Sequence, residues 1–411
     1  MYFSQKYKKK KRLGYLLKIF PLLSETFVIG EIEEFKKRNL QIIVASIYRP
    51  PHVLIARSHN NFHQNILYWF DIDRSILACI LKKNFKFFIK HPFKYLATFL
   101  KWKRSFSFSE LLKLVYLTDY FSSKDVYHIH THFAWEHLLF LQFIKDLVGI
   151  TYSVTVHAAD IFTQDKMILK NLLNKAHFVA TISNYNKSFL IHNHIVDSSK
   201  VFLVRCGINS SWLKEEVKPI WINSPPRILS IGRLVPKKGF DILICALAFL
   251  KKENIPFYAE IIGSGPLENE LKSMISKYNL DLKVKLLGSL DHSKVKEKLK
   301  NSDIFVLACK QAPNGDMDGI PVVLMEAMAL GKIVISTKLS GIPELIQHEE
   351  NGFLVEPNNP FELAQTLKMI LKNSYPTQIV YSARETISKK YTIEKQVDSL
   401  LKAFRLFSID I

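Results

Sequence analysis

Cysteine is scarce in this sequence and poorly placed for cross-linking. Its four cysteines, Cys79, Cys206, Cys245 and Cys309, stand far apart, and no two of them share the Cys-x-x-Cys spacing. This pattern excludes a disulfide scaffold or a structural zinc site as the basis of the fold, and it suits a reducing compartment.

Long uncharged apolar runs are missing as well. No such run reaches the ~20 residues that a membrane-spanning helix needs, so we predict no transmembrane span. The segment LGYLLKIFPLL, which follows the basic run Lys8–Arg12, has the position of a signal peptide core. However, Lys18 interrupts it and no small-residue cleavage site follows. We therefore interpret it as a first strand and expect a cytoplasmic protein.

The length and charge of the chain point to a multidomain globular protein with an anionic partner. The 411 residues predict two or three domains, and 48% of them are apolar, which is ample for buried cores. The net charge is +20, and the first 200 residues hold 29 basic and 14 acidic side chains, against 28 and 23 in the rest. The positive first half implies nucleic acid, anionic lipid or a phosphorylated substrate as partner.

The segment 75–109 has no acidic residue at all. Its eight basic residues alternate with aromatic ones such as Phe85, Phe93 and Trp102. This interleaving suits a helix that lies on an anionic membrane surface. The alternative is an ordinary helical pair whose aromatic side chains face the core. Nucleic acid is the weaker reading, because no RNA- or DNA-binding motif accompanies the charge, and we expect no nucleic-acid partner.

Strand and helix patterns alternate along both halves of the chain. Strands are expected at 15–20 and in IIVASIY, VYHIHTHF, YSVTVHA and FVATISN, with a helix in TFVIGEIEEFKKRN. The aperiodic stretch 207–226 marks a linker, after which the alternation of strands and helices begins again with RILSIGRL. The pattern predicts two tandem doubly wound α/β domains, whose ligands bind beyond the carboxyl ends of the strands, in the cleft between the domains.

Two loops of the second half carry the residue types that bind a diphosphate. In SIGRLVPKKG, a strand is followed by Arg233 and Lys238, which offer a fork of donors and a point charge near a helix start. GSGP, with Gly263 and Gly265, is a second strand-to-helix turn in which the backbone can approach a ligand closely.

Two carboxylates stand eight residues apart in DGIPVVLMEAMALGKIVIST. Asp318 lies in a loop and Glu326 within a helix. Carboxylate oxygens at this spacing can accept hydrogen bonds from two hydroxyl-bearing parts of one ligand. Because the neighbours of Glu326 are apolar, an idle surface position is disfavoured for it.

These motifs together resemble the GT-B glycosyltransferases of family 4. GRLVPKKG, GSGP, DGIPVVLMEAMALGKIVIST, SGIPELI and NGFLVEP look like the donor half of that family. FPLLSETFV, HTHF, TVHAADIF and TISNYN resemble the acceptor half of the branch that builds exopolysaccharides such as colanic acid. The resemblance runs from about residue 15 to 406 in the family's own order.

The resemblance implies a GT-B fold with three parts. Residues 1–215 would form the acceptor-side domain, 216–388 the donor domain, and 389–411 a helix that crosses back to the first domain. It also implies transfer of a sugar from a UDP- or GDP-linked donor with retention of configuration, with no metal or other cofactor required.

The acceptor would be a lipid-linked oligosaccharide of an exopolysaccharide, capsule or lipopolysaccharide, on the inner face of the cytoplasmic membrane. The alternatives are a same-fold epimerase or glycan phosphorylase, or a basic membrane- or nucleic-acid-binding scaffold without catalysis.

The same resemblance assigns roles to the donor-half residues. Arg233 and Lys238 would hold the diphosphate, and Glu326 the ribose. Asp318 stands where most members have Glu, and it would contact the donor sugar one methylene short of that residue. The remaining donor-binding positions are Gly263, Gly265, Gly319, Ile320 and Pro321.

The first half supplies fewer expected site residues. His157 matches the histidine beside the donor sugar, and Asp160 either orients a loop or caps the following helix, the cap being favoured. Ser24, Glu25 and Thr26 are expected to contact the phosphate or the acceptor, or to cap a helix. His128, His130 and His132 share one face of a strand, where packing at the sheet end is favoured over a metal triad.

Overall fold

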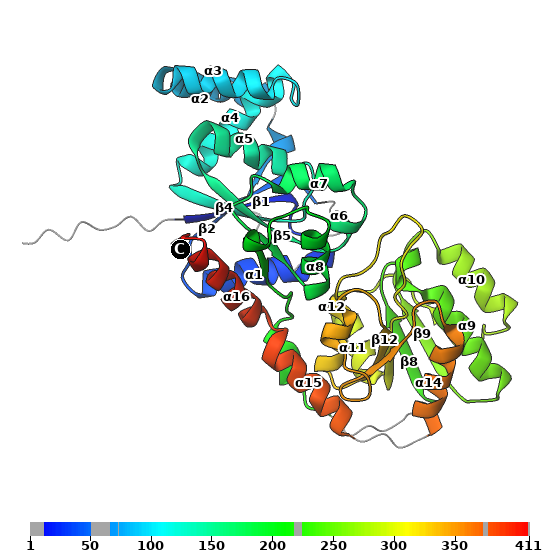
Figure 1. Cartoon of the computed structure of the whole chain (residues 1–411). Coiled ribbons are helices and arrows are strands. Elements are labelled where there is room, and N and C mark those ends of the chain that lie inside the picture. Colours follow the sequence, from blue (N-terminus) through cyan, green and yellow to red (C-terminus); the bar gives the residue numbers. More distant parts are fainter. Residues whose placement is uncertain (1–11, 51–65, 73, 218–223, 373–376, 410–411) are drawn as a thin grey trace, which may run out of the picture.

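The computed structural model describes residues 12–50, 66–72, 74–217, 224–372 and 377–409. These residues form two α/β domains, one after the other along the chain, and a final helix that returns to the first domain (Figure 1). The tandem doubly wound architecture predicted from the sequence is confirmed.

The first sheet has seven parallel strands in the order β3-β2-β1-β4-β5-β6-β7. Its strands are β1 (Arg12–Ile19), β2 (Ile42–Tyr48), β3 (Leu67–Tyr68), β4 (Val126–His132), β5 (Thr151–Val156), β6 (Val179–Thr181) and β7 (Val201–Leu203). The helices of this half are α1 (Thr26–Lys37), α2 (Leu77–Lys90), α3 (Pro92–Trp102), α4 (Phe108–Ser122), α5 (Leu138–Val148), α6 (Ala159–Phe162), α7 (Lys166–Leu173) and α8 (Asn184–His192). Strands such as β1 and β4 are buried along most of their length, as parallel strands covered on both faces must be.

The second sheet has six parallel strands in the order β10-β9-β8-β11-β12-β13. Its strands are β8 (Arg227–Ile231), β9 (Tyr258–Ile262), β10 (Val284–Leu286), β11 (Ile304–Val306), β12 (Ile333–Thr337) and β13 (Phe353–Val355). Its helices are α9 (Phe240–Lys252), α10 (Glu268–Lys277), α11 (His292–Asn301), α12 (Val322–Ala329), α13 (Ile342–Leu345) and α14 (Pro360–Lys372).

In each sheet the strand order reverses at one point, between β1 and β4 in the first and between β8 and β11 in the second. In open α/β sheets, the loops that leave the carboxyl ends of the strands at such a point form the ligand site. The loops that follow β1, β4, β8 and β11 are therefore the ones that matter for function.

Two C-terminal helices connect the second domain to the first. α15 (Gln378–Lys390) packs on α12 of the second domain, and α16 (Ile393–Leu406) packs on α1 of the first (Figure 1). Val397, Leu400 and Phe404 of α16 belong to the same core cluster as the residues of β1 and α1. This packing makes α16 part of the first domain's core.

The stretch that the sequence indicates as a linker is partly structured. Ser210–Lys214 forms a short 3-10 helix, and Trp212 within it is buried in the core of the second domain. The linker interpretation is wrong for this portion, because a single buried tryptophan gives no periodic signal in the sequence. The following residues 218–223 lie outside the described part of the chain.

The basic segment 75–109 folds into the antiparallel pair α2 and α3, which lies at the end of the first domain remote from the second (Figure 1). Its inner face is anchored by Asn84, which accepts a 2.8 Å hydrogen bond from the Tyr95 hydroxyl, and by Trp102, whose indole donates to Asp146 at 2.9 Å. On the outer face Phe85 is 64% and Phe93 88% exposed. Some of the aromatic residues face the core, as in the helical-pair interpretation, and others face solvent.

None of the helices in the described ranges combines the length and apolarity needed to cross a bilayer.

Gly207 is the point where the backbone of α16 comes closest to the end of β7. A Cβ at this position would lie 2.2 Å from the carbonyl carbon and oxygen of Thr392. The backbone N–H of Ile208 donates to the Tyr391 carbonyl and that of Ile393 to the Ile208 carbonyl, both at 2.9 Å. Small residues are required here because backbone cannot move aside as a flexible side chain can.

We expect Gly207→Ala to lower the free energy of unfolding by about 1–3 kcal/mol, the usual cost of forcing extra atoms into a packed region. Urea denaturation checks this value. Gly149→Asn is the control, because no atom lies within 4 Å of a Cβ there and Asn tolerates its φ of +84°. Equal stability of Gly207→Ala and wild type would contradict the packing of α16 described above.

Candidate active site

The two sheets direct their carboxyl ends toward each other at a narrow contact. A Cβ on Gly319, in the loop before α12, would lie 2.7 Å from Ile182 and 3.6 Å from the Cβ of Ala158. Gly341, which begins α13, is similarly close to Ser183. The loops around Gly319 and Ala158 therefore bring the expected site residues of both halves to one place.

A group of paired charges holds the donor-half loops together. Lys238, after β8, contacts Asp318 at 2.6 Å, and Lys237 contacts Asp318 at 3.4 Å and Asp316 at 3.0 Å. Burial raises the pKa of Asp318, but the two lysines outweigh this effect and leave its pKa below the ordinary value. Asp318 is thus an anion held between two ammonium groups, and the predicted site residues Lys238 and Asp318 are each other's partners.

Lys237 and Asp316 were not among the expected site residues. Lys237 is almost fully buried, which is rare for a lysine unless it is paired. The first aspartate of NGDMDG and the first lysine of VPKKG are the sequence features that could have indicated this pairing.

Arg233 and Glu326 have no hydrogen-bond or ion-pair partner among the described residues. Arg233 is exposed at the end of β8. Glu326, one turn into α12, is partly buried, and this burial raises its pKa to about 8. A carboxyl group that is buried and unpaired carries an unfavourable desolvation cost, which a bound ligand with hydroxyl groups can relieve.

Glycines bring the loops after β8 and β9 into contact. A Cβ on Gly263 would fall 1.8 Å from the carbonyl oxygen of Gly232, and one on Gly265 2.5 Å from that of Leu234. The φ of Gly263, +146°, is also one that only glycine adopts readily. Both glycines therefore shape the floor of the Arg233 loop, while Ile320 and Pro321 are buried at the start of α12.

In the first half, His157 lies directly after β5 and is buried. Its ring stacks on that of His132, with 5.3 Å between centroids, and also contacts Phe27 and Phe133. Its Nε2 lies 3.1 Å from His132 Nδ1 and its Nδ1 lies 3.8 Å from Cys206 Sγ. Both ring nitrogens are thus engaged within the protein, and burial holds the pKa of His157 well below the ordinary value.

Asp160 is not a helix cap. Its carboxylate accepts hydrogen bonds from the backbone N–H groups of Ala134, at 2.9 Å, and His157, at 3.0 Å. No side chain caps α6. Asp160 instead fixes the loop after β4 against the end of β5, which is the loop-orienting alternative. Burial raises its pKa to about 6, although the backbone donors oppose that shift.

Two of the three strand histidines, His128 and His130, form a buried hydrogen-bond ladder. His128 bonds to Thr151 and Ser153, and His130 to Ser153 and Thr155, at 2.7–2.9 Å. These partners lie on the neighbouring strand β5, so the ladder packs the sheet as expected from the sequence.

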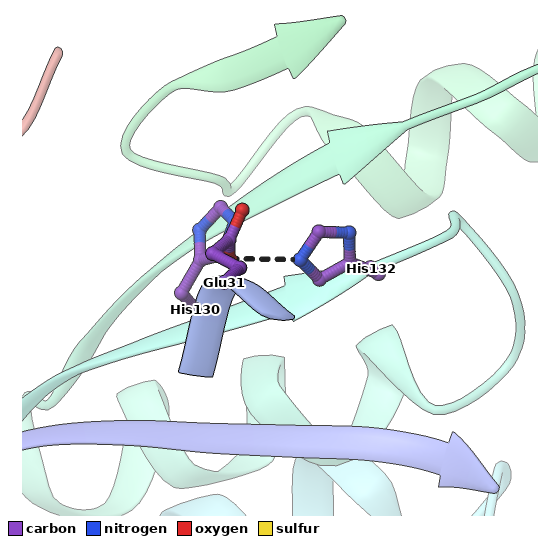
Figure 2. Close-up of side chains that lie close together, drawn as sticks. All are labelled: Glu31, His130 and His132. Atoms are coloured by element: carbon purple, nitrogen blue, oxygen red, sulfur yellow. Dashed lines mark hydrogen bonds and ion pairs between the residues drawn. The ribbon is translucent and has the colours of Figure 1, made fainter. Parts of the chain in front are cut away.

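His132 differs from the other two strand histidines, because it faces Glu31 of α1 at 3.0 Å (Figure 2). Ligand-type atoms of Glu31, His130 and His132 lie within 4.8 Å of one another. All three side chains are already hydrogen bonded to other protein groups.

The loop after β1 places Ser24, Glu25 and Thr26 at the amino end of α1. None of them makes a side-chain cap to that helix. Burial raises the pKa of Glu25 to about 7, His132 opposes the shift, and Asp160 adds to it. Glu25 is therefore electrostatically coupled to the His132–Asp160 region of the site.

Glu344 ties the two domains together beside this contact. Its carboxylate accepts hydrogen bonds from Arg205 at 2.8 Å, the backbone of Tyr185 at 3.0 Å and Asn184 at 3.2 Å. It lies on α13 of the second domain, whereas all three donors belong to the first.

The chain resembles known sugar-transferring proteins. Residues 214–390 match the family described as Glycosyl transferases group 1. The putative colanic acid biosynthesis glycosyltransferase WcaL of Escherichia coli (strain K12) is 38% identical over 210 residues, 50% of this chain and 51% of that protein. The amylovoran biosynthesis glycosyltransferase AmsK of Erwinia amylovora is 29% identical over 394 residues, 92% and 96% of the two chains. The chain thus spans about half the length of WcaL and almost all of AmsK.

Solved structures show the same architecture. A glycosyltransferase from Rickettsia africae ESF-5 aligns with a TM-score of 0.72 at 18% identity, covering 97% of this chain and 100% of that one. HepE of Anabaena, solved in complex with UDP-glucose, aligns with a TM-score of 0.72 at 16% identity, covering 96% and 99%. At these identities the likeness establishes the fold. The chain therefore has the GT-B fold, and residues 214–390 are similar to the group 1 glycosyl transferases.

Proposed function

We propose that the protein transfers a sugar, with retention of configuration and without a metal, from a UDP- or GDP-linked donor to a growing oligosaccharide. The observation that carries this proposal is that some charged residues of the donor half are paired and others are not. Asp316, Asp318, Lys237 and Lys238 balance one another, whereas Arg233 and Glu326 have no partner in the described ranges. An unpaired cation and an unpaired buried carboxyl suit the two ends of a nucleoside diphosphate.

Each donor-half residue then has a distinct task. Arg233 offers five N–H donors to the diphosphate, and Lys238 adds a point charge as the leaving group gains negative charge. Glu326 accepts hydrogen bonds from the ribose, and Asp318 contacts a sugar hydroxyl beside Gly319. His157, with Ala158, lies across from that loop. The complex of HepE with UDP-glucose supports a nucleotide-sugar donor, and the names of WcaL and AmsK support an exopolysaccharide product.

The acceptor in this proposal is lipid-linked, and the protein works at the inner surface of the cytoplasmic membrane. The outer face of α2 and α3 carries exposed Phe85, Phe93 and Leu100 beside lysines. Apolar side chains that enter the headgroup region, together with lysines that attract anionic lipid, favour such peripheral binding. A scaffold without catalysis would bind the same lipids but would not bind a nucleotide saturably.

Glu326→Gln tests the donor site. The amide cannot replace a carboxylate that accepts two ribose hydroxyls, so above pH 8, where the group is ionised, we expect nucleotide binding to weaken by about 1.5–3 kcal/mol. Calorimetric titration with UDP, GDP and their sugars, with and without EDTA, measures this loss. Glu270→Gln on the exposed face of α10 is the matched control. Equal nucleotide affinity in both variants and the wild type would sink the donor-site assignment.

The same variant should change stability in the opposite direction. Because the pKa of Glu326 is about 8 in the folded protein, above the ordinary value of 4.5, its contribution favours folding at low pH and is lost as pH rises to 8. The amide of Glu326→Gln stays neutral. We therefore expect the variant to melt at a higher temperature than wild type above pH 8, with the difference vanishing below pH 4.5. Thermal scans from pH 4 to 9 check it.

Glu25→Gln tests the acceptor side. With a pKa of about 7, Glu25 becomes a carboxylate able to accept a hydrogen bond from the acceptor hydroxyl as pH rises through neutrality. We expect wild-type kcat/KM for the acceptor, at saturating donor, to rise across this range and the rise to flatten in the variant. A pH–rate profile measures both. If kcat/KM of Glu25→Gln rises with pH as it does in the wild type, the rise belongs to the titration of another group.

Vesicle co-sedimentation tests the membrane surface. We expect binding to phosphatidylglycerol vesicles at low salt and little to neutral ones. Replacing Lys86, Lys90 and Lys94 together by Gln should weaken it by about 3 kcal/mol, since each lysine near an anionic surface contributes about 1 kcal/mol. The same triple change at Lys252, Lys277 and Lys285 of the second domain is the control. Equal losses in the two triple variants would point to a diffuse charge effect.

A further inference from the structure

A chain of four buried side chains runs through the first domain to His157. Glu31 of α1 accepts from His132 Nε2 at 3.0 Å, and His132 Nδ1 lies 3.1 Å from His157 Nε2. The chain ends at Cys206, whose Sγ lies 3.8 Å from His157 Nδ1. Glu31 and His132 are fully shielded from solvent, and neither was expected in the site from the sequence (Figure 2).

Glu31 fixes the direction of this chain because it can only accept. Burial raises its pKa, but His132 and the hydrogen bonds from His132 and Tyr15 outweigh that effect and lower it to about 2. The Tyr15 hydroxyl and the Gln396 amide each donate to the carboxylate at 2.6 Å. Three donors thus stabilise one buried anion, and Gln396 supplies one of them from α16.

The positions of the other protons in this hydrogen-bonded group can then be assigned. Burial holds the pKa of His157 well below the ordinary value, so its ring carries a single hydrogen. With that hydrogen on Nε2, His157 donates to His132 Nδ1, and His132 donates from Nε2 to Glu31. The pKa of the Cys206 thiol is raised by burial, so the thiol keeps its proton and can donate to His157 Nδ1. Every donor in the chain then points toward Glu31, an arrangement in which each bond polarises the next.

His157 lies close to the place where the two domains meet. The backbone N–H of His157 is held by Asp160, and its carbonyl accepts from Asn186. The next residue, Ala158, contacts the Gly319 loop that carries Asp318. The orientation of His157 therefore sets where this strand end meets the donor-half loop.

We infer that Glu31 and His132 are positioning residues, which hold His157 as one neutral tautomer in one orientation at the carboxyl end of β5. The inference rests on the proposed sugar transfer for its effect on rate, but the tautomer is a property of the protein alone. His128 is not part of it, because this histidine bonds only to hydroxyl groups of β5.

The tautomer is read directly by ¹⁵N NMR of the full chain labelled at histidine, with the His157 signals assigned by their loss in His157→Gln. We expect a protonated, pyrrole-type Nε2 and a pyridine-type Nδ1. A His157 that carries its proton on Nδ1, or on both nitrogens, overturns the inference. This measurement needs no acceptor and no variant of Glu31 or His132.

The effect on catalysis is tested with Glu31→Leu/His132→Phe, which replaces the buried polar pair by apolar groups and so leaves no unpaired charge to unfold the protein. His157 then loses its fixed tautomer, and we expect kcat to fall about 100-fold, as small misplacements in a site do. The nucleotide affinity should stay unchanged.

His128→Phe is the matched control, since it removes a buried histidine from the same face of β4 without touching the chain. It should leave the His157 signals and kcat as in wild type. Wild-type kcat in the double variant would overturn the inference. Absence of any transfer by the wild type would instead overturn the proposed function, and the tautomer of His157 would still be read in that case.

Discussion

The structure depends on how two lysines and two aspartates pair in a largely buried space at the end of the second sheet. Removing charges from water is costly, and only pairing makes it tolerable. Lys237 and Lys238 come from the loop after β8, and Asp316 and Asp318 from the loop after β11. Their ion pairs therefore join the two loops that flank the point where the strand order reverses. Arg233 and Glu326 take no part in these ion pairs, and they are the groups that we assign to binding of the donor.

The first domain also buries a charged group, which it stabilises with hydrogen-bond donors. Its buried anion, Glu31, is stabilised by three hydrogen-bond donors, and burial keeps the neighbouring histidines 130 and 157 neutral. One of these donors, Gln396, lies on the helix that returns from the second domain, and it also accepts from the backbone of Gly207 at 2.8 Å. The close approach at Gly207 and the contact at Glu344 thus hold the two domains relative to each other. The site requires these two domains to face each other.

Much of the fold followed from local sequence. Buried parallel strands read as apolar runs, and glycines at 263 and 265 marked turns that the structure shows to be sterically obligatory. Asp318 and Lys238 were expected in one site, but 80 residues separate them, and nothing local shows that they pair with each other. Glu31 and His132 were missed for the same reason, since they are 101 positions apart in the sequence. Trp212 and Asp160 were misread because burial by distant segments, rather than local periodicity, decides their roles.

The most direct test of this account is a crystal structure of the protein with UDP or GDP, whichever binds. The account predicts the diphosphate on Arg233 and Lys238, the ribose hydroxyls on the Glu326 carboxylate, and the β-phosphate directed toward the Gly319–Ala158 contact. A nucleotide bound elsewhere, with Glu326 still unpaired, would contradict the assignment of the donor site.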